Sequence, residues 1–264
     1  MLTLNWGSAT DVGRVRQLNE DGWWASATLF AVADGMGGHA AGEVASELAI
    51  DEMRRISELS PLHAEDLAHA VDQANERILA AGLERGDRYG LGTTITGLAV
   101  VSAGGSEHWA VFNVGDSRVY RFAGNRLSQL TIDHSEVQEL VAAGQLAREQ
   151  ARFHPRRNVV TRSLGSDPAP APDIWVFPPS TGDRFLICSD GLTGEVDDSD
   201  IAAVLFQERE PQQAAQTLVA RANASGGRDN VTVVVVDLVD VTETVDVDSD
   251  TSPRIAPENG DEPA

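Results

Sequence analysis

The chain of 264 residues contains no lysine: all 20 of its basic residues are arginine, against 41 acidic residues and a formal net charge of −21. Phosphate-binding loops of nucleotide hydrolases, protein-kinase sites and Schiff-base enzymes each need a lysine, so these classes are excluded. The acidic excess also excludes a nucleic-acid binder, because affinity for a phosphate backbone needs a basic surface.

Cysteine and long apolar runs are scarce as well. Cys188 is the single cysteine, so the chain forms no internal disulfide and no zinc site built from paired cysteines. We expect Cys188 itself to be a buried residue of a strand. No apolar run approaches the roughly 20 residues that span a bilayer. The first residues, MLTLNWGSATDVG, lack the basic and apolar regions of a secretion signal. We therefore expect a soluble, cytoplasmic protein without a membrane partner.

Strand-like and helical patterns follow one another in groups. Apolar residues recur on one helical face from Ala45 to Ile56 and again from Leu67 to Ile78, and a later helical pair is expected at 198–207 and 211–223. Helices in pairs and strands in groups predict antiparallel sheets flanked by helices, not a doubly wound parallel sheet. The strand-like runs are 23–33, 93–101, 109–114, 118–122, 183–188 and 231–238.

The C-terminal segment 240–264 differs from the rest in composition. It holds eight acidic residues, three prolines and one arginine, with few large apolar side chains. Such a segment buries too little apolar surface to offset its ordering entropy, so we expect disorder. Residues 1–239 are expected to form one folded domain.

Four aspartates lie at the ends of four strand-like runs. Asp34 and Asp190 each follow an apolar run and precede a glycine, in VADGMGG and CSDGLTG. Asp116 follows a third run in VFNVGDS, and Asp229 precedes the last in GGRDNVTVVVV. A turn explains one such aspartate, but four indicate carboxylates gathered in one cleft. Their mutual repulsion favours a divalent cation, and oxygen donors without a His or Cys cluster favour magnesium or manganese over zinc.

Two further residues fit such a site. Gly35 has no Cβ, so its carbonyl could approach a metal closely. Arg16 precedes the acidic pair Glu20 and Asp21, and a guanidinium binds phosphate through two parallel hydrogen bonds. The same spacing also fits an arginine that simply pairs with Glu20.

Six motifs, in order along residues 4–238, resemble those of the metal-dependent serine/threonine protein phosphatases of type 2C in their bacterial form. The resemblance implies an α+β fold, a four-layer α-β-β-α sandwich in which paired helices flank two central antiparallel β-sheets. It implies hydrolysis of phosphoserine and phosphothreonine on proteins by a metal-bridging water, a reaction that reverses Ser/Thr kinase signalling. It also implies a monomer, with a Ser/Thr protein kinase among its substrates. The motifs are VRQLNED, VADGMGGHAAGE, LGTTITG, VGDSRVYR, CSDGLTG and GGRDNVTVVVV.

The resemblance also implies a set of metal ligands. Asp34 would bridge two Mn²⁺ or Mg²⁺ ions, and Gly35 would bind the second ion through its carbonyl. Asp190 and Asp229 would hold the first ion. Asp116, together with Asp190, would hold a weaker third ion.

The remaining roles concern the substrate and the waters. By resemblance, Arg16 would bind the substrate phosphate, while Glu20 and Asp21 would act on the metal-bound waters. Animal members carry a histidine after the Asp-Gly pair, proposed as general acid, where this chain has Met36. We give the nearby His39 no role, so a metal-bound water is the default acid.

Residues 133–165 correspond to the variable flap of the family. From residue 148 onward this segment has one acidic residue, Glu149, and five arginines. Such a basic stretch either attracts phosphopeptides or forms a solvated face. The arginines are Arg148, Arg152, Arg156, Arg157 and Arg162.

Two rival functions are considered. A non-catalytic or weakly catalytic relative that binds phosphoproteins would have lost a metal aspartate, and none is missing. A specialised phosphatase acting on a regulatory protein would carry an extra sensor domain, for which we see no room.

Overall fold

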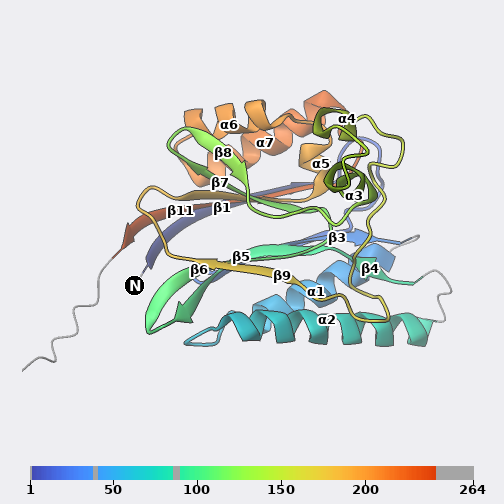
Figure 1. Ribbon diagram of the computed structural model, residues 1–264, viewed down its shortest axis with the longest axis horizontal. Helices are drawn as coiled ribbons and strands as arrows, with labels where there is room; N and C mark the ends of the chain where they lie inside the picture. Colours follow the sequence, from blue (N-terminus) through green and yellow to red (C-terminus); the bar gives the residue numbers. More distant parts are fainter. Residues whose placement is uncertain (1, 38–40, 86–89, 242–264) are drawn as a thin grey trace, which may run out of the picture.

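The computed structural model describes residues 2–37, 41–85 and 90–241. Within these ranges two antiparallel sheets lie face to face, and helices cover both outer faces (Figure 1). The strand order is β1-β11-β10-β7-β8 in one sheet and β2-β3-β5-β6-β9 in the other, with β4 paired to β3. The predicted α-β-β-α sandwich is confirmed.

The elements divide between the two halves of the sandwich. The first sheet holds β1 (Leu2–Asp11), β7 (Arg118–Ala123), β8 (Arg126–Gln129), β10 (Arg184–Cys188) and β11 (Val231–Val241), covered by α6 (Asp198–Gln207) and α7 (Pro211–Ser225). The second holds β2 (Asp21–Ala25), β3 (Leu29–Met36), β4 (Gly92–Thr93), β5 (Ile95–Ala103), β6 (Ser106–Val114) and β9 (Asp173–Phe177), covered by α1 (Ala41–Ile56) and α2 (Ala64–Arg85). Three short helices are α3 (Glu136–Ala142), α4 (Arg148–Ala151) and α5 (Asp190–Thr193).

The alternation of side chains along each strand builds the layers. Phe30 and Val32 of β3 pack between the sheets, whereas Ala31 and Ala33 pack against α1 and α2. A strand that is buried on both faces is apolar throughout, which explains the unbroken valine run of β11. The buried interior therefore has three clusters, one between the sheets and one under each helical layer.

The structure corrects several boundaries predicted from the sequence. The run 23–33 is not one strand but a hairpin, in which the N–H of Ser26 donates to the carbonyl of Leu29 at 2.9 Å. The sequence concealed this turn because it contains neither glycine nor proline. Strands β1, β8 and β9 were not predicted, since their sequences are short or half polar. Strand β11 continues to Val241, past the expected domain end at 239.

Other predictions lie partly outside the described part of the chain. Residues 242–264, which make up nearly all of the segment expected to be disordered, are outside it, and so is His39. No helix among the described residues is long and apolar enough to cross a membrane. The predicted helical pair at 198–207 and 211–223 corresponds to α6 and α7.

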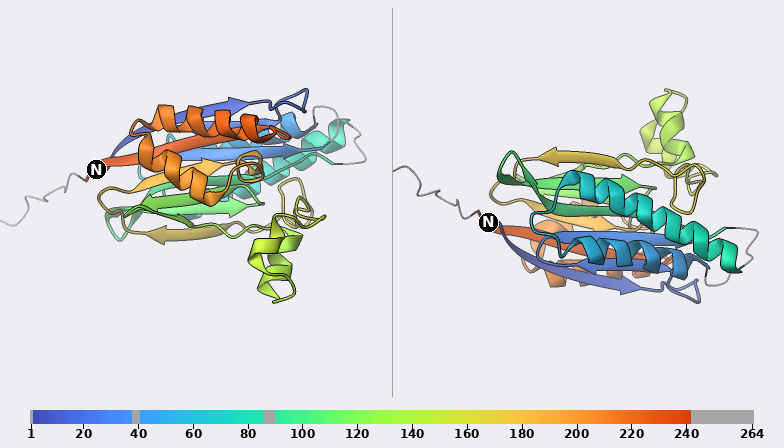
Figure 2. Two further views of the ribbon diagram at one scale, coloured as in Figure 1. Left: turned by 90° about the horizontal axis from the view of Figure 1, so that it is seen from above. Right: turned by 90° about the horizontal axis from the view of Figure 1, so that it is seen from below.

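One end of the sandwich gathers the segments that carry the motifs. The loops after β6 and β10, the loop before β11 and the end of β3 all lie at the end of the sandwich where α5 is found (Figure 1). Helices α3 and α4, which belong to the predicted flap, project from the side of the sandwich at this end (Figure 2).

Candidate metal and phosphate site

Asp21 of β2 lies directly opposite Asp34 of β3 in the antiparallel register. Opposed residues of a strand pair project from the same face with Cβ atoms about 4.5–5.5 Å apart. Burial, and then the charges of Asp21 and Asp190, raise the pKa of Asp34 well above its usual range. Burial raises the pKa of Asp21 to about 7. The hairpin that the sequence concealed therefore brings two carboxylates together.

Two more aspartates lie close enough to add their charges. Asp190 is the first residue of α5 and is separated from β10 by Ser189, and Asp116 follows β6 with 8% of its surface exposed. Burial, and then the charge of Asp229, raise the pKa of Asp190, although a hydrogen bond with the Asp34 side chain opposes the rise. Burial, and then the charge of Asp190, raise the pKa of Asp116 well above its usual range. Because the charge of Asp229 acts on Asp190, the structure brings together all four aspartates identified from the sequence, Asp34, Asp116, Asp190 and Asp229, and adds Asp21 to them.

Arg16 lies on the loop between β1 and β2, beside this cluster. Its Nη2 donates a hydrogen bond to Oδ2 of Asp229 at 2.7 Å, and its side chain is 49% exposed. This bond, together with the charges of Asp229, Glu20 and Asp34, raises the pKa of Arg16 despite partial burial. The simple pair with Glu20 that the spacing allowed does not form in the structure. The ion-pair partner of Arg16 in the structure is Asp229 instead.

The cluster has the properties of a cation site without a preformed ligand shell. Oε1 of Glu20 and Oδ1 of Asp21 are buried and have no hydrogen-bond partner among the described residues. In the same part of the chain, no three Asp, Glu, His or Cys side chains are arranged to hold a metal ion as they stand. A buried oxygen without a hydrogen-bond partner and the mutual repulsion of carboxylates both destabilise the folded state. A hard divalent cation would coordinate the oxygen and neutralise the repulsion. The donor set therefore fits Mn²⁺ or Mg²⁺ once the side chains turn toward the ion.

Gly35 brings the end of β3 against the start of α1. A Cβ atom on Gly35 would lie 2.3 Å from the carbonyl oxygen of Gly42 and 2.5 Å from that of Glu20, so no side chain fits. The Gly35 N–H also donates to the Glu20 carbonyl at 3.2 Å. Packing alone thus requires glycine here, and metal binding by its carbonyl stays a prediction.

Hydroxyl groups that the sequence analysis did not single out hold the aspartates in place. Oγ1 of Thr94 accepts a hydrogen bond from the Asp34 N–H at 2.9 Å and lies 2.8 Å from Oγ of Ser117. Oγ of Ser189 donates to Oδ2 of Asp21 at 2.8 Å. These residues belong to the quoted motifs LGTTITG, VGDSRVYR and CSDGLTG, which was the available signal.

Asn230 organises the loop that carries Arg16. Its Oδ1 accepts from the Glu20 N–H at 2.9 Å, and its Nδ2 donates to the carbonyls of Val12 at 3.0 Å and Leu18 at 2.8 Å. One side chain thus holds both ends of the loop. Its position directly after Asp229 in the last motif was the only sequence signal.

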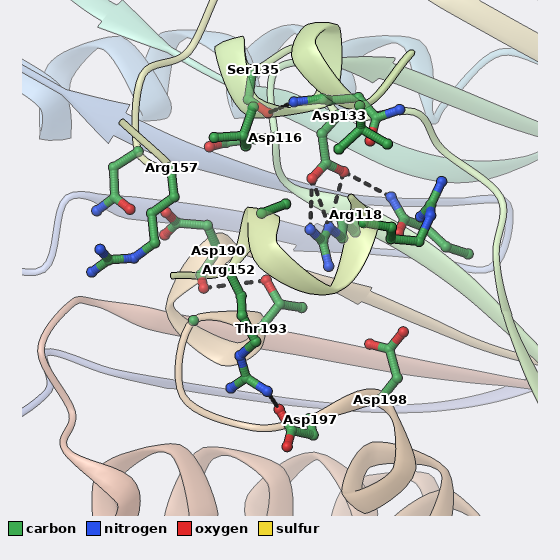
Figure 3. Close-up of a pocket in the computed structure, with 18 of the residues that line it drawn as sticks. Asp116, Arg118, Asp133, Ser135, Arg152, Arg157, Asp190, Thr193, Asp197 and Asp198 are labelled. Atoms are coloured by element: carbon green, nitrogen blue, oxygen red, sulfur yellow. Dashed lines mark hydrogen bonds and ion pairs between the residues drawn. The ribbon is translucent and has the colours of Figure 1, made fainter. Parts of the chain in front are cut away.

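Arg118 connects the site to the flap. Its Nε and Nη2 donate to the carboxylate of Asp133, at 2.9 Å to Oδ1 and 2.6 Å to Oδ2, as seen in Figure 3. Its Nη1 donates to the hydroxyl of Tyr120 at 2.8 Å, and that hydroxyl donates to Oδ1 of Asp198 on α6 at 3.2 Å. The charge of Arg118 also lowers the pKa of Asp116 against the dominant effect of burial. The network therefore joins β7, the first residue of the flap and α6.

A cavity of about 460 Å³ lies between the flap and helices α5 and α6. We call it the flap pocket. Asp116 and Asp190 line one side of it, so it is continuous with the carboxylate cluster (Figure 3). Arg152 and Asp197, which both line the pocket, form an ion pair (Figure 3). The flap is thereby tied to the loop before α6.

Comparisons with known proteins agree with this fold and site. Residues 14–225 match the family model described as Protein phosphatase 2C. The chain is 38% identical over 241 residues to the serine/threonine phosphatase stp of Listeria welshimeri, across 86% of this chain and 93% of that protein. It is 40% identical over 243 residues to the serine/threonine protein phosphatase PstP of Mycobacterium tuberculosis, across 90% of this chain and 46% of that protein.

Among solved structures, the catalytic domain of PstP in complex with two manganese ions matches with a TM-score of 0.83 and 38% identity, across 91% of this chain and 100% of that chain. The four-layer sandwich with its acidic cluster is thus a protein phosphatase fold. The chain belongs to the protein phosphatase 2C family, so the predicted family and enzyme class are confirmed.

Proposed function

We propose that this chain hydrolyses phosphoserine and phosphothreonine on proteins with Mn²⁺ or Mg²⁺ bound at the aspartate cluster. The observation that supports this best is the convergence of carboxylates with raised pKa values, the buried Asp116 and the partly buried Asp34 and Asp190, beside the half-exposed Arg16. The names of the relatives and the two manganese ions in the PstP catalytic domain support the same function. The family resemblance adds a Ser/Thr protein kinase to the proposed substrates.

In this proposal different aspartates of the cluster bind different cations. Asp34, the Gly35 carbonyl, Asp190 and Asp229 would hold the two core ions, with Asp34 serving both. Asp116 with Asp190 would hold a weaker third ion. Bound cations would supply Lewis-acid chemistry, because they lower the pKa of water and neutralise charge on the phosphoryl group.

The side chains around the cations have separate tasks. Arg16 can bind two phosphate oxygens because its guanidinium is half exposed at the edge of the cluster. Oδ1 of Asp21 and Oε1 of Glu20, which are buried and unpartnered among the described residues, can accept hydrogen bonds from the attacking water. Met36 follows Gly35 and cannot donate a proton, so the general acid is not a side chain at that position.

The test is turnover of a phosphothreonine peptide with Mn²⁺ and with excess chelator. We expect hydrolysis only with the metal, and its loss in Asp34→Asn. The matched control is Asp72→Asn, which changes the same chemical group at an exposed position of α2. Full turnover in chelator would contradict the proposal. Tight binding of phosphopeptides without turnover would favour the non-catalytic alternative.

A further inference from the structure

Two arginines of the flap pocket have no ion-pair partner among the described residues. Arg148 opens α4, and Arg157 follows that helix; both line the pocket and both are exposed. The charge of Arg157 contributes, after the dominant hydrogen bond from Arg228, to the lowered pKa of Glu195. Arg157 therefore lies close to the end of α5.

Two of the three aspartates in the outer part of the pocket form ion pairs. Asp133 is held by Arg118, and Asp197 pairs with Arg152. The third, Asp198, accepts a hydrogen bond from the neutral hydroxyl of Tyr120 and keeps its negative charge. Two more flap arginines are used within the fold, in the pairs Arg156–Glu136 and Arg162–Asp173. The outer lining therefore has four arginines against three aspartates, Asp133, Asp197 and Asp198, in a protein with a net charge of −21, and Arg148 and Arg157 are the two of these arginines without an ion pair among the described residues.

The position of the pocket relates these charges to the substrate. Asp116 and Asp190 line its inner side, so a phosphorylated residue at the carboxylate cluster would place its sequence neighbours at the pocket. A volume of about 460 Å³ is within the range of ligand sites, roughly 300–1,000 Å³. Ser135 and Asn158 add neutral hydrogen-bonding groups to the lining.

We propose that the flap pocket binds a second anionic side chain of the substrate, a carboxylate or a second phosphate, close in sequence to the residue being dephosphorylated. Arg148 and Arg157 are the specificity-determining residues. This inference rests on the proposed function and identifies the substrate class as acidic or multiply phosphorylated segments.

The experiment compares four kinds of substrate with the Mn²⁺-loaded full chain. Three kinds are series of phosphothreonine peptides. Within each series one residue, at each of the four positions on either side of the phosphothreonine in turn, is alanine, glutamate or phosphoserine. The fourth is p-nitrophenyl phosphate, which has no neighbouring residues. The enzymes are the native chain, the double variant Arg148→Ala/Arg157→Ala, and Arg126→Ala/Arg209→Ala, which removes two exposed arginines outside the flap pocket.

We expect the native enzyme and the Arg126/Arg209 control to prefer the anionic peptides in kcat/KM, mainly through KM, by about five- to tenfold, the size expected for two exposed ion pairs. The Arg148/Arg157 variant should lose this preference and retain turnover of p-nitrophenyl phosphate. The preference should also decrease at high salt, because exposed charges are screened.

Several results would overturn the inference. One is a native enzyme that hydrolyses p-nitrophenyl phosphate without preferring anionic peptides; a second is a preference that survives in the Arg148/Arg157 variant. An equal loss in both double variants would also overturn it, by showing an effect of net charge only. No hydrolysis of any substrate would overturn the proposed function as well. A preference for the phosphoserine peptide alone would support the inference and identify the second phosphate as the ligand.

Discussion

Arg16 and Asp229 are separated by 213 positions in the sequence, yet Nη2 of Arg16 lies 2.7 Å from Oδ2 of Asp229. A residue proposed to bind phosphate is therefore paired with one proposed to bind metal. A cation that binds Asp229 would compete with the guanidinium and free it for the substrate. Metal loading and phosphate binding are thus expected to be coupled through this pair.

Arg16→Ala should raise KM for phosphopeptides and leave Mn²⁺ affinity equal or higher, because the change removes a phosphate ligand and a cation that competes for Asp229. The loss should be about 1.5–3 kcal/mol for each charged hydrogen bond to phosphate. Steady-state kinetics and Mn²⁺ titration by calorimetry measure the two effects. The neighbouring variant Arg14→Ala, which loses only a bond to the Asn223 carbonyl, is the control. A large fall in metal affinity with an unaltered KM would contradict the assignment.

Asp34→Asn should reduce the stabilisation that Mn²⁺ gives to the fold. Cation binding relieves the repulsion among buried carboxylates, and at a hundred times the dissociation constant one site adds about 2.7 kcal/mol. The metal-free variant should be as stable as the native chain or more so, because one of the repelling groups is neutral. Thermal melting with and without Mn²⁺ compares the increments, with Asp72→Asn as control. An undiminished increment in Asp34→Asn would place the metal elsewhere.

The metal-free protein should lose stability as the pH rises through neutrality. Burial raises the pKa of Asp21 from 3.8 to about 7, so the folded state binds more protons than the unfolded state between these values. Stability then falls with increasing pH, by about 1–3 kcal/mol between pH 5 and pH 8. Urea unfolding in chelator at several pH values measures this, and Asp21→Asn should reduce the dependence without abolishing it, because the raised pKa values of Asp34, Asp116 and Asp190 also contribute. A stability that rises over this range would contradict the burial of these carboxylates.

Arg118→Met should destabilise the fold through the network that joins the flap to α6. The change leaves the carboxylate of Asp133, 11% exposed, without its bidentate partner. Because Arg118 is 26% exposed, we expect about 2–3 kcal/mol, below the range for a fully buried pair. The control is Arg221→Met, whose exposed contact with Asp200 spans 3.9 Å and should contribute less than about 1 kcal/mol. Equal losses in the two variants by urea unfolding would exclude a special role for the network.

Thiol reagents should leave the activity unaltered. Cys188 is fully buried in β10, and burial raises the pKa of its thiol to about 12, so almost no thiolate is present near neutral pH. Incubation with iodoacetamide before a phosphopeptide assay tests this. Rapid inactivation, accompanied by mass-spectrometric labelling of Cys188, would contradict it.

Local sequence patterns by themselves determined the layers and most of the candidate site. The side-chain alternation of β3, the valine run of β11 and the paired helical patterns are set by residues a few positions apart, and so they are visible in the sequence. The same is true of Asp34 and Asp190, because an aspartate and a glycine that follow an apolar run form a local feature, although Asp34 lies within the last residues of β3 and Ser189 separates Asp190 from β10.

Only the tertiary structure decided which of these groups meet and how they are charged. The partner of Arg16 is Asp229 and not Glu20, because the loop between β1 and β2 folds over the start of β11. Asp21 reaches a pKa of about 7 because elements distant in sequence exclude water from it. Ion pairing and burial depend on distances in space, and the order of residues along the chain does not contain these distances.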